Sequence, residues 1–219
     1  MSDERYSRQQ DIVPAERIRQ TQATVIGVGA IGRQVALQLA AIGVPWLQLV
    51  DFDTVEESNL ASQGYLEKDL GRPKVEATAG LCRRINSALE IEVIPERFRR
   101  SSRTGNSIFC CVDQIHIRRQ IWQATGSQAA FWTDGRMSAE VLRVLTACDY
   151  ESRQHYPTTL FSTEEAYAGP CTAKTTIYCA NIAAGLMLAQ FTRHLRQLPV
   201  EPDIQLNLLA CELNLAAGR

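Results

Sequence analysis

The sequence has 219 residues, of which 45% are apolar and 21% are charged, and its formal net charge is −1. This length and composition predict one sizeable α/β domain with a substantial hydrophobic core. The balanced charge argues against a polyanionic partner such as nucleic acid, and no apolar stretch approaches the roughly 18 residues that span a bilayer.

The N-terminus and the cysteines indicate a cellular compartment. The first residues, MSDERYSRQQD, are charged throughout, which is not the pattern of a signal peptide. Seven cysteines without a secretory signal are typical of a protein with reduced thiols. We therefore expect a cytoplasmic protein that binds neither a membrane nor nucleic acid.

The predicted elements alternate between strands and helices through the first 133 residues. The segment 2–20 is an amphipathic, arginine-rich helical arm interrupted near Pro14. Apolar runs around a glycine turn then predict strand, helix and strand, the order of a right-handed βαβ unit. The elements that we expect after the arm are strands at 23–28, 46–50, 90–95, 107–112 and 129–133, and helices at 30–42, from Pro73 and at 115–125.

The alternation of strands and helices ends in the C-terminal part. A strand at 140–147 has no helix before it, and the polar residues 149–170 predict a long loop or short helical pieces. An apolar helix at 175–198 precedes a final strand or hairpin at 204–215. The second half of a full dinucleotide-binding fold is missing. We expect a Rossmann-like mixed sheet, parallel in its N-terminal half and antiparallel in its C-terminal strands, with helices on both faces.

A glycine-rich turn predicts a nucleotide site. The stretch VIGVGAIGRQ places Gly27, Gly29 and Gly32 between the first strand and the first long helix. Such a turn lets the backbone approach phosphate, and the helix N-terminus behind it favours anions. Asp51 and Asp53 end the next strand, where an acid can bind a ribose hydroxyl. This spacing alone is also typical of NAD-dependent dehydrogenases.

Further polar residues favour phosphate chemistry over hydride transfer. Lys74 lies close to a predicted helix start and can reach phosphates on the glycine turn, although a solvated surface lysine is the alternative. Asp113 ends the strand FCCVDQ beside the earlier acids, and several carboxylates near phosphates indicate a Mg²⁺ site. Asn59 adds a polar group, although the ordinary interpretation is a helix N-cap at Ser58 or Asn59.

Five short motifs follow one another along the chain: RYSRQ at 5–9, GVGAIG at 27–32, VDFDTVEESNLASQ at 50–63, GRPKVEA at 71–77 and CVDQ at 111–114. In this order they resemble the ThiF-type adenylyltransferases, and the resemblance covers nearly the whole chain. That superfamily includes the molybdopterin-synthase and thiamine-pathway adenylyltransferases and the ubiquitin-activating enzymes. The resemblance implies a single ThiF-type adenylation domain at 1–219, with an N-terminal helical arm at 1–20 and a loop at 149–174.

The resemblance also implies an activity. Members of the family use ATP and Mg²⁺ to adenylate the C-terminal glycine of a ubiquitin-like or sulfur-carrier β-grasp protein. Pyrophosphate leaves, and the acyl-adenylate passes to sulfur or to a downstream thiol acceptor. The residues present suit this chemistry, because charge that grows on the phosphates needs positive groups nearby.

Roles for individual residues follow from the matching motif positions. The resemblance implies that Lys74 and Arg8 stabilise the phosphates and that Asp113 binds Mg²⁺. Asp51 would hold the ribose, and Asn59 would lie near the phosphates. In family members the counterpart of Arg8 reaches the neighbouring subunit's site, which implies a homodimer. The remaining nucleotide-binding positions that the resemblance implies are Gly27, Gly29, Ala30, Ile31, Gly32 and Asp53.

The chain departs from the family pattern at three points. Ser62 stands where the family's S-N-L-x-R-Q motif has arginine, so one phosphate cation is absent. Arg33 or Arg72 is a hypothetical replacement because of proximity in sequence, and weak or lost catalysis is the alternative. Gln114 stands where asparagine is usual. Many relatives bind a structural zinc through two C-x-x-C pairs, and since none occurs here we expect no zinc.

Cys171 is a candidate nucleophile in the stretch AGPCTAKTTIYC. A thiol near a helix N-terminus has its thiolate stabilised by the helix dipole, and Lys174 adds to this effect. The position resembles the active-site cysteine of ubiquitin-like-activating enzymes, above all the autophagy type, which implies a thioester with the carried protein. The alternative is an inert residue at a loop–helix junction.

These features lead to one principal hypothesis and three alternatives. The principal hypothesis is an ATP-dependent activating enzyme with thioester transfer at Cys171. The first alternative is adenylation without a thioester, of a sulfur carrier or a peptide, and the second is a catalytically weak nucleotide-binding scaffold. An NAD-binding module is the third, disfavoured by the phosphate-chemistry residues and the missing second half.

Overall fold

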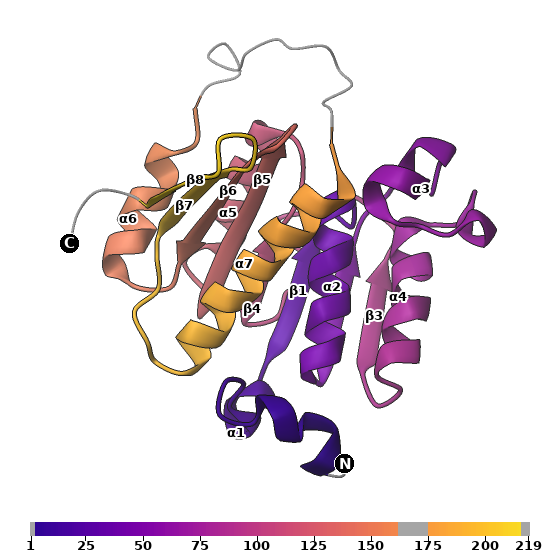
Figure 1. Cartoon of the computed structure of the whole chain (residues 1–219), viewed down its shortest axis with the longest axis horizontal. Helices are drawn as coiled ribbons and strands as arrows, with labels where there is room; N and C mark the ends of the chain where they lie inside the picture. The colour runs from indigo at the N-terminus through magenta and orange to yellow at the C-terminus, as the bar shows by residue number, and fades with distance from the viewer. Residues whose placement is uncertain (1–2, 162–174, 216–219) are drawn as a thin grey trace.

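A single eight-stranded mixed sheet organises the computed structural model, which describes residues 3–161 and 175–215 (Figure 1). The spatial order of the strands is β3-β2-β1-β4-β5-β6-β7-β8. The first five strands pair in parallel and the pairings from β5 to β8 are antiparallel, so the predicted fold class is confirmed. The strands are β1 (Gln22–Ile26), β2 (Trp46–Val50), β3 (Glu90–Ile94), β4 (Ser107–Cys110), β5 (Phe131–Ser138), β6 (Val141–Ala147), β7 (Asp203–Asn207) and β8 (Glu212–Leu215).

Helices cover both faces of the sheet. Helices α2, α4 and α7 lie in front of it in Figure 1, with α2 and α7 in contact, and α5 and α6 pack on the other face. Within the described ranges, no helix combines the length and the apolar character needed to cross a membrane. The helices are η1 (Asp3–Gln9, 3-10), α1 (Ala15–Ile18), α2 (Ala30–Ile42), α3 (Glu57–Gln63), η2 (Glu67–Asp69, 3-10), α4 (Lys74–Ile85), α5 (Ile115–Thr125), α6 (Tyr150–Thr158) and α7 (Ile177–Leu195).

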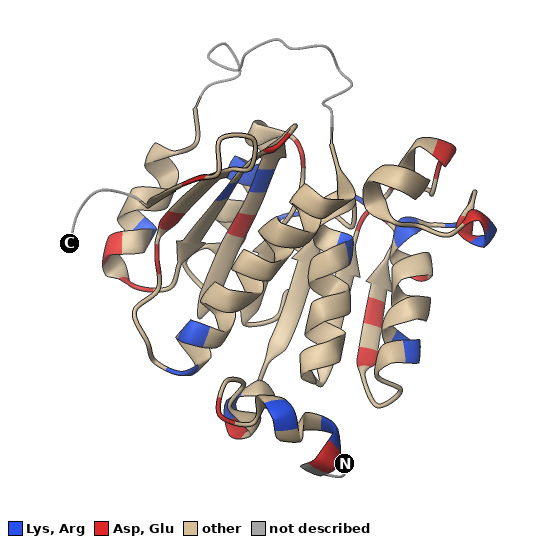
Figure 2. Cartoon of the chain, viewed as in Figure 1, with Lys and Arg blue, Asp and Glu red and all other residues tan. Residues whose placement is uncertain are grey.

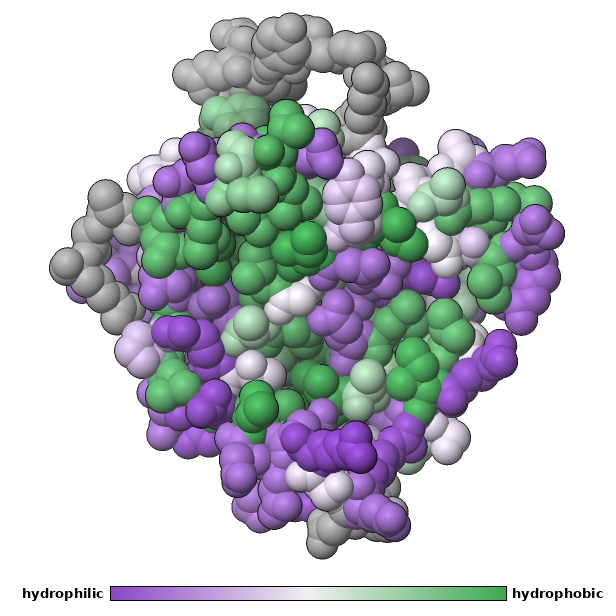
Figure 3. All heavy atoms as spheres, in the orientation of Figure 1, coloured by the Kyte–Doolittle hydropathy of each residue, from purple (hydrophilic) through white to green (hydrophobic). Residues whose placement is uncertain are grey.

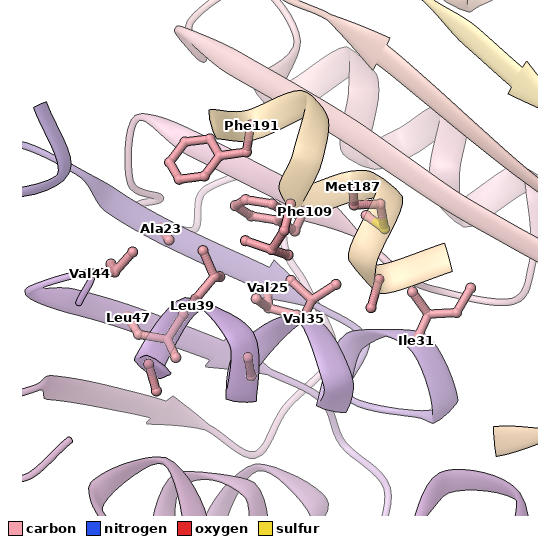
Figure 4. Packing of buried hydrophobic residues seen from close by; sticks show 14 of the residues in the cluster. Ala23, Val25, Ile31, Val35, Leu39, Val44, Leu47, Phe109, Met187 and Phe191 are labelled. Atoms are coloured by element: carbon pink, nitrogen blue, oxygen red, sulfur yellow. The ribbon is translucent and has the colours of Figure 1, made fainter. Parts of the chain in front are cut away.

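The core has two layers because successive strand residues point to opposite faces. Val25 and Ile26 are adjacent in β1, and they join different hydrophobic clusters on the two sides of the sheet. On the α2 and α7 side, Phe109 of β4 packs edge-on against Phe191 of α7 at a ring separation of 5.4 Å (Figure 4). Small residues on α7, such as Ala183, let this helix approach α2 closely.

Most predicted elements are present, with corrections at their ends and between them. The stretch 149–170, expected as a loop or short helical pieces, contains α6, which Asp149 caps by accepting the Ser152 backbone N–H at 2.9 Å. Helix α3 begins after Glu56, so the predicted N-cap at Ser58 or Asn59 is wrong. Of the two alternatives predicted for 204–215, a strand or a hairpin, the structure has the hairpin, formed by β7 and β8.

An apolar patch remains exposed on the face shown in Figure 3, over the β7–β8 hairpin and the start of α7. Exposed patches of this kind are typical of surfaces that contact other proteins. The exposed large apolar residues of these elements are Ile177, Tyr178, Ile182, Leu209, Leu213 and Leu215.

Two glycines give a direct test of the packing. A Cβ at Gly32 would overlap the carbonyl oxygen of Gly27, so for Gly32→Ala we expect the free energy of unfolding to fall by about 3 kcal/mol. Gly80 of α4 has open space around a Cβ, so Gly80→Ala should raise that free energy by up to about 1 kcal/mol. Urea denaturation followed by circular dichroism measures both, and equal stability of the two variants would contradict the tight turn.

Candidate functional site

A cavity of about 760 Å³ opens at the edge of the sheet where the parallel strands end. Its walls come from the turn after β1, the loops after β2, β3 and β4, and the end of β5. Ligands of open α/β sheets bind at this edge, outside the carboxyl ends of the strands. The cavity brings together eight residues singled out from the sequence: Gly27, Gly29, Ala30, Ile31, Asp51, Asp53, Lys74 and Asp113.

The glycines of the turn after β1 serve different purposes. Gly27 has φ +85°, and a Cβ there would lie 2.8 Å from the backbone of Cys111, so the chain itself requires a glycine. Gly32 is required by its contact with Gly27, although it does not line the cavity. A Cβ on Gly29 would meet only Gln63 Oε1, at 3.8 Å, and Gly29 lines the cavity. The room at Gly29 therefore fits a phosphate group lying against the turn and the start of α2.

Asp51 joins the glycine turn to the loop after β2. Its Oδ2 accepts the Val28 backbone N–H at 2.6 Å, and its Oδ1 accepts the Asp53 backbone N–H at 2.9 Å. Burial raises the pKa of the Asp51 carboxyl, and the two backbone bonds oppose that rise. Each carboxylate oxygen retains a further lone pair, so Asp51 can still accept a hydrogen bond from a ribose hydroxyl.

Lys74 is a buried cation in the cavity wall. It begins α4 after the cap residue Pro73, is only 6% exposed, and places its Nζ 3.1 Å from Asp53 Oδ2. The alternative of a solvated surface lysine is therefore wrong. Because a buried ammonium needs a negative partner, the half-exposed Asp53 is its protein counter-ion, and phosphate is a suitable additional one.

The side chain of Asn59 belongs to the cap of α3. Its Oδ1 accepts the Glu56 backbone N–H at 3.0 Å, and Asn59 is not among the residues that line the cavity. Ser62, at the position of the missing family arginine, donates from Oγ to the Ser58 carbonyl at 2.8 Å. This part of α3 thus uses its polar groups within the helix.

The two hypothetical replacements for the missing arginine do not line the cavity. Arg33 is buried with its guanidinium carbon 4.8 Å from the centre of the Tyr65 ring, and burial lowers its pKa. Arg72 forms an ion pair with Asp69 at 2.9 Å. Their nearness in sequence to the glycine turn and to Lys74 therefore does not carry their guanidinium groups into the cavity.

Arg8 lies far from the cavity of its own chain. It is exposed on η1, whose last residue, Gln9, donates from Nε2 to the Ile42 carbonyl at 3.0 Å. Ile42 ends α2, whereas the cavity lies at the beginning of that helix (Figure 1). Cys171, the candidate nucleophile, lies outside the described residues.

Three arginines on the cavity wall were not predicted. Arg97 stacks on Phe52 at 3.7 Å from the ring centre, and Arg118 and Arg136 both form ion pairs with the buried Asp134. Figure 2 shows basic residues at the upper ends of β5 and β6, near this part of the site. Asp113 was predicted because ligands bind where parallel strands end. The same rule applies to β5, which contains Arg136, but no motif indicates Arg118 in α5.

The donor set fits Mg²⁺ only together with a phosphate ligand. Among the described residues, no three His, Cys, Asp or Glu side chains form a group that could hold a metal ion. Asp113 is an exposed carboxylate on the cavity wall. Mg²⁺ commonly takes one or two carboxylates, with phosphate oxygens and waters completing its shell.

The fold and the cavity at its sheet edge define an α/β protein of the Rossmann-like class. The model of the ThiF family matches residues 6–212, and the chain belongs to the ThiF family.

Two curated relatives match about half of the chain. The molybdopterin-synthase adenylyltransferase of Salmonella typhimurium is 33% identical over 128 residues, which cover 53% of this chain and 51% of the relative. The ubiquitin-like modifier-activating enzyme 5 of Caenorhabditis elegans is 30% identical over 139 residues, which cover 56% of this chain and 33% of the relative. The chain thus spans about half or less of the length of these relatives.

Solved structures share the fold over nearly the whole chain. The crystal structure of PaaA has a TM-score of 0.78 at 20% identity and covers 97% of this chain and 72% of that one. E. coli MccB crystallised with ATP has a TM-score of 0.73 at 16% identity and covers 98% of this chain and 71% of that one.

Replacement of Lys74 tests the cavity as a phosphate site. Lys74→Ala should weaken binding of ATP about 10- to 100-fold, because a charge-assisted contact contributes about 1.5–3 kcal/mol. Lys68→Ala, at an exposed residue of η2, is the matched control and should leave the affinity unchanged. Isothermal titration with a non-hydrolysable ATP analogue measures both variants, and equal affinities would contradict phosphate binding at Lys74.

Proposed function

We propose that this protein uses ATP and Mg²⁺ to adenylate the C-terminal carboxylate of a small ubiquitin-like or sulfur-carrier protein. The observation that carries the proposal is one cavity that contains the glycine turn, the buried Lys74 and the carboxylate of Asp113. The names of the curated relatives support it, since they are an adenylyltransferase and a modifier-activating enzyme. The exposed apolar patch supports a protein as the acceptor.

The chemistry follows from the placement of the groups. An acceptor carboxylate oxygen attacks the α-phosphorus of ATP, and the bond from this phosphorus to the oxygen that bridges to the β-phosphate breaks. Pyrophosphate leaves with the bonding electrons. Lys74 balances charge on the phosphates, Asp51 orients the ribose, and the bare Gly29 lets the phosphates approach the start of α2. Asp113 would hold Mg²⁺, which when bound neutralises phosphate charge.

A second copy of the chain is part of the proposal. Arg8 is exposed at the opposite end of α2 from the cavity, so it does not reach the cavity of its own chain. In the proposed homodimer, Arg8 enters the neighbouring subunit's site, and it belongs to the N-terminal arm of an adenylation domain that extends over residues 1–219. Arg97, on the cavity wall, adds positive charge at the site.

The proposal includes a second step, in which the acyl group passes from the adenylate to the thiol of Cys171. Phe161 and Thr175 are described residues on either side of the segment that contains Cys171, and both line the cavity. This arrangement supports a thiol that receives the acyl group from the adenylate. Adenylation without a thioester and a catalytically weak scaffold remain the alternatives, and Ser62 in place of an arginine favours the scaffold.

Pyrophosphate exchange tests adenylation. In the presence of a β-grasp protein ending in Gly-Gly, the wild-type protein should exchange labelled pyrophosphate into ATP, and Asp113→Asn should lower the rate by about 100-fold or more, an effect of about 3 kcal/mol. Glu57→Gln, an exposed acid of α3, is the control and should keep the wild-type rate. ATP binding without exchange for any carrier would favour the scaffold.

A thiol-sensitive conjugate tests the transfer step. The wild-type protein, ATP and the carrier should form a covalent adduct that DTT releases, and Cys171→Ala should abolish it because no acceptor thiol remains. Cys211→Ala, at the exposed turn between β7 and β8, should form the adduct normally. Non-reducing electrophoresis and mass spectrometry detect the adduct, and its persistence in Cys171→Ala would eliminate the thioester at this residue.

A further inference from the structure

A buried ion cluster of Asp134, Arg118 and Arg136 forms part of the cavity wall. Asp134 of β5 is fully buried and forms ion pairs with Arg118 of α5 and, at 2.8 Å, with Arg136 of β5. Tyr156 of α6 donates its hydroxyl to Asp134 Oδ2 at 2.9 Å. Arg136 also donates to the backbone carbonyl of Thr159 at 2.9 Å. Both arginines of the cluster line the cavity.

The cluster carries more positive than negative charge. It holds two guanidinium groups and one carboxylate, and burial raises the pKa of Tyr156, which keeps that hydroxyl neutral. Arg118 is 5% exposed, and burial lowers its pKa. A buried cation without a full counter-charge is costly, so an anion that enters the cavity would stabilise this cluster.

The sheet register places the cluster at the same edge of the sheet as the glycine turn. Val50, Ile26, Cys110 and Asp134 are successive partners across β2, β1, β4 and β5. The ribose acid follows the first of these residues, and the glycine turn follows the second. Since neighbouring strands lie about 4.8 Å apart, Asp134 is about 10 Å from the level of the glycine turn. The cavity wall therefore runs from Asp51, past the glycine turn, to the cluster.

In the proposed reaction the acceptor carboxylate is a second anion, and it needs a binding site of its own in the cavity. The acceptor carboxylate and the triphosphate are both negative, so they repel one another as they approach. Lys74 neutralises charge on the nucleotide side only. A cationic group on the other side would hold the carboxylate against the repulsion and fix its distance from phosphorus.

We propose that Arg118 and Arg136, oriented by Asp134, bind the C-terminal carboxylate of the acceptor protein and position it for attack on the α-phosphate. The inference rests on the proposed function and names the subsite for the acceptor. Asp134 is a positioning residue: it divides its charge between the two guanidinium groups and leaves them net positive. Once the oxygen–phosphorus bond forms, the carboxylate charge is lost, the hold of the arginines weakens, and the acyl group is free to leave.

A carboxylate titration without turnover tests the subsite. Trp122 and Trp132 pack on Tyr156 at ring separations of 4.6 and 4.2 Å, so their fluorescence reports on the cluster. With a non-hydrolysable ATP analogue bound, glycylglycine should change this fluorescence saturably. Glycylglycinamide, which lacks the carboxylate, should bind about 10-fold or more weakly, and this comparison needs no variant. Arg136→Gln should weaken glycylglycine binding by a similar factor, with the affinity for the ATP analogue unchanged.

Arg143→Gln is the matched control. Arg143 lies in the neighbouring strand β6 and pairs with Asp203 at 2.6 Å, outside the cluster, so its loss should leave glycylglycine binding unchanged. Equal affinity for the dipeptide and its amide would overturn the inference, as would Arg136-dependent binding of inorganic pyrophosphate in place of glycylglycine. Because the titration requires no chemistry, missing pyrophosphate exchange with an intact preference for glycylglycine would contradict the proposed function alone.

Discussion

The close backbone contact at the turn after β1 is the constraint on which the rest of the site depends. Gly27 adopts φ +85° and packs against the backbone of Cys111, and Gly32 packs against the Gly27 carbonyl. Neither position leaves room for a Cβ. The Asp51 carboxylate then binds the Val28 N–H at 2.6 Å and joins the turn to the loop after β2. Because α2 starts from this turn, its N-terminus points into the cavity, where it favours phosphate.

The cavity combines two electrostatic environments, and the proposed reaction assigns them to different substrates. At the ends of β1, β2 and β4, carboxylates and the buried Lys74 suit a nucleotide with a divalent cation. Within β5, Asp134 forms ion pairs with Arg136 of the same strand and with Arg118 of α5, so this group of three side chains has a net positive charge. A strand order in which β4 and β5 follow β1 sets these regions side by side. The antiparallel strands after β5 stand where the second half of a dinucleotide fold would follow.

The sequence predicted best those elements whose defining residues are close neighbours in the chain. Helix α2 and strand β2 have the predicted bounds, because apolar runs and a glycine turn define them within a few residues. The polar sequence of α6 does not define a helix by itself. The helix is stabilised by a cap at Asp149 and by the burial of Tyr156 against tryptophans that are distant in sequence. The N-cap of α3 was predicted at Ser58 or Asn59, but it is Glu56. Asn59 lies inside the helix, and its side chain accepts a hydrogen bond from the Glu56 backbone N–H.

The sequence by itself determined the class of fold, the glycine turn and the strand ends at which acids gather, since each depends on neighbours in the chain. Tertiary structure alone decided which cations face the cavity. Lys74 lines it and Arg33, although beside the glycine turn in sequence, stacks on Tyr65 instead. Arg118 and Arg136 meet only because α5 and β5 pack together around Asp134. An arginine or lysine side chain is long and flexible, so its direction is set by packing between elements remote in sequence, which no local pattern records.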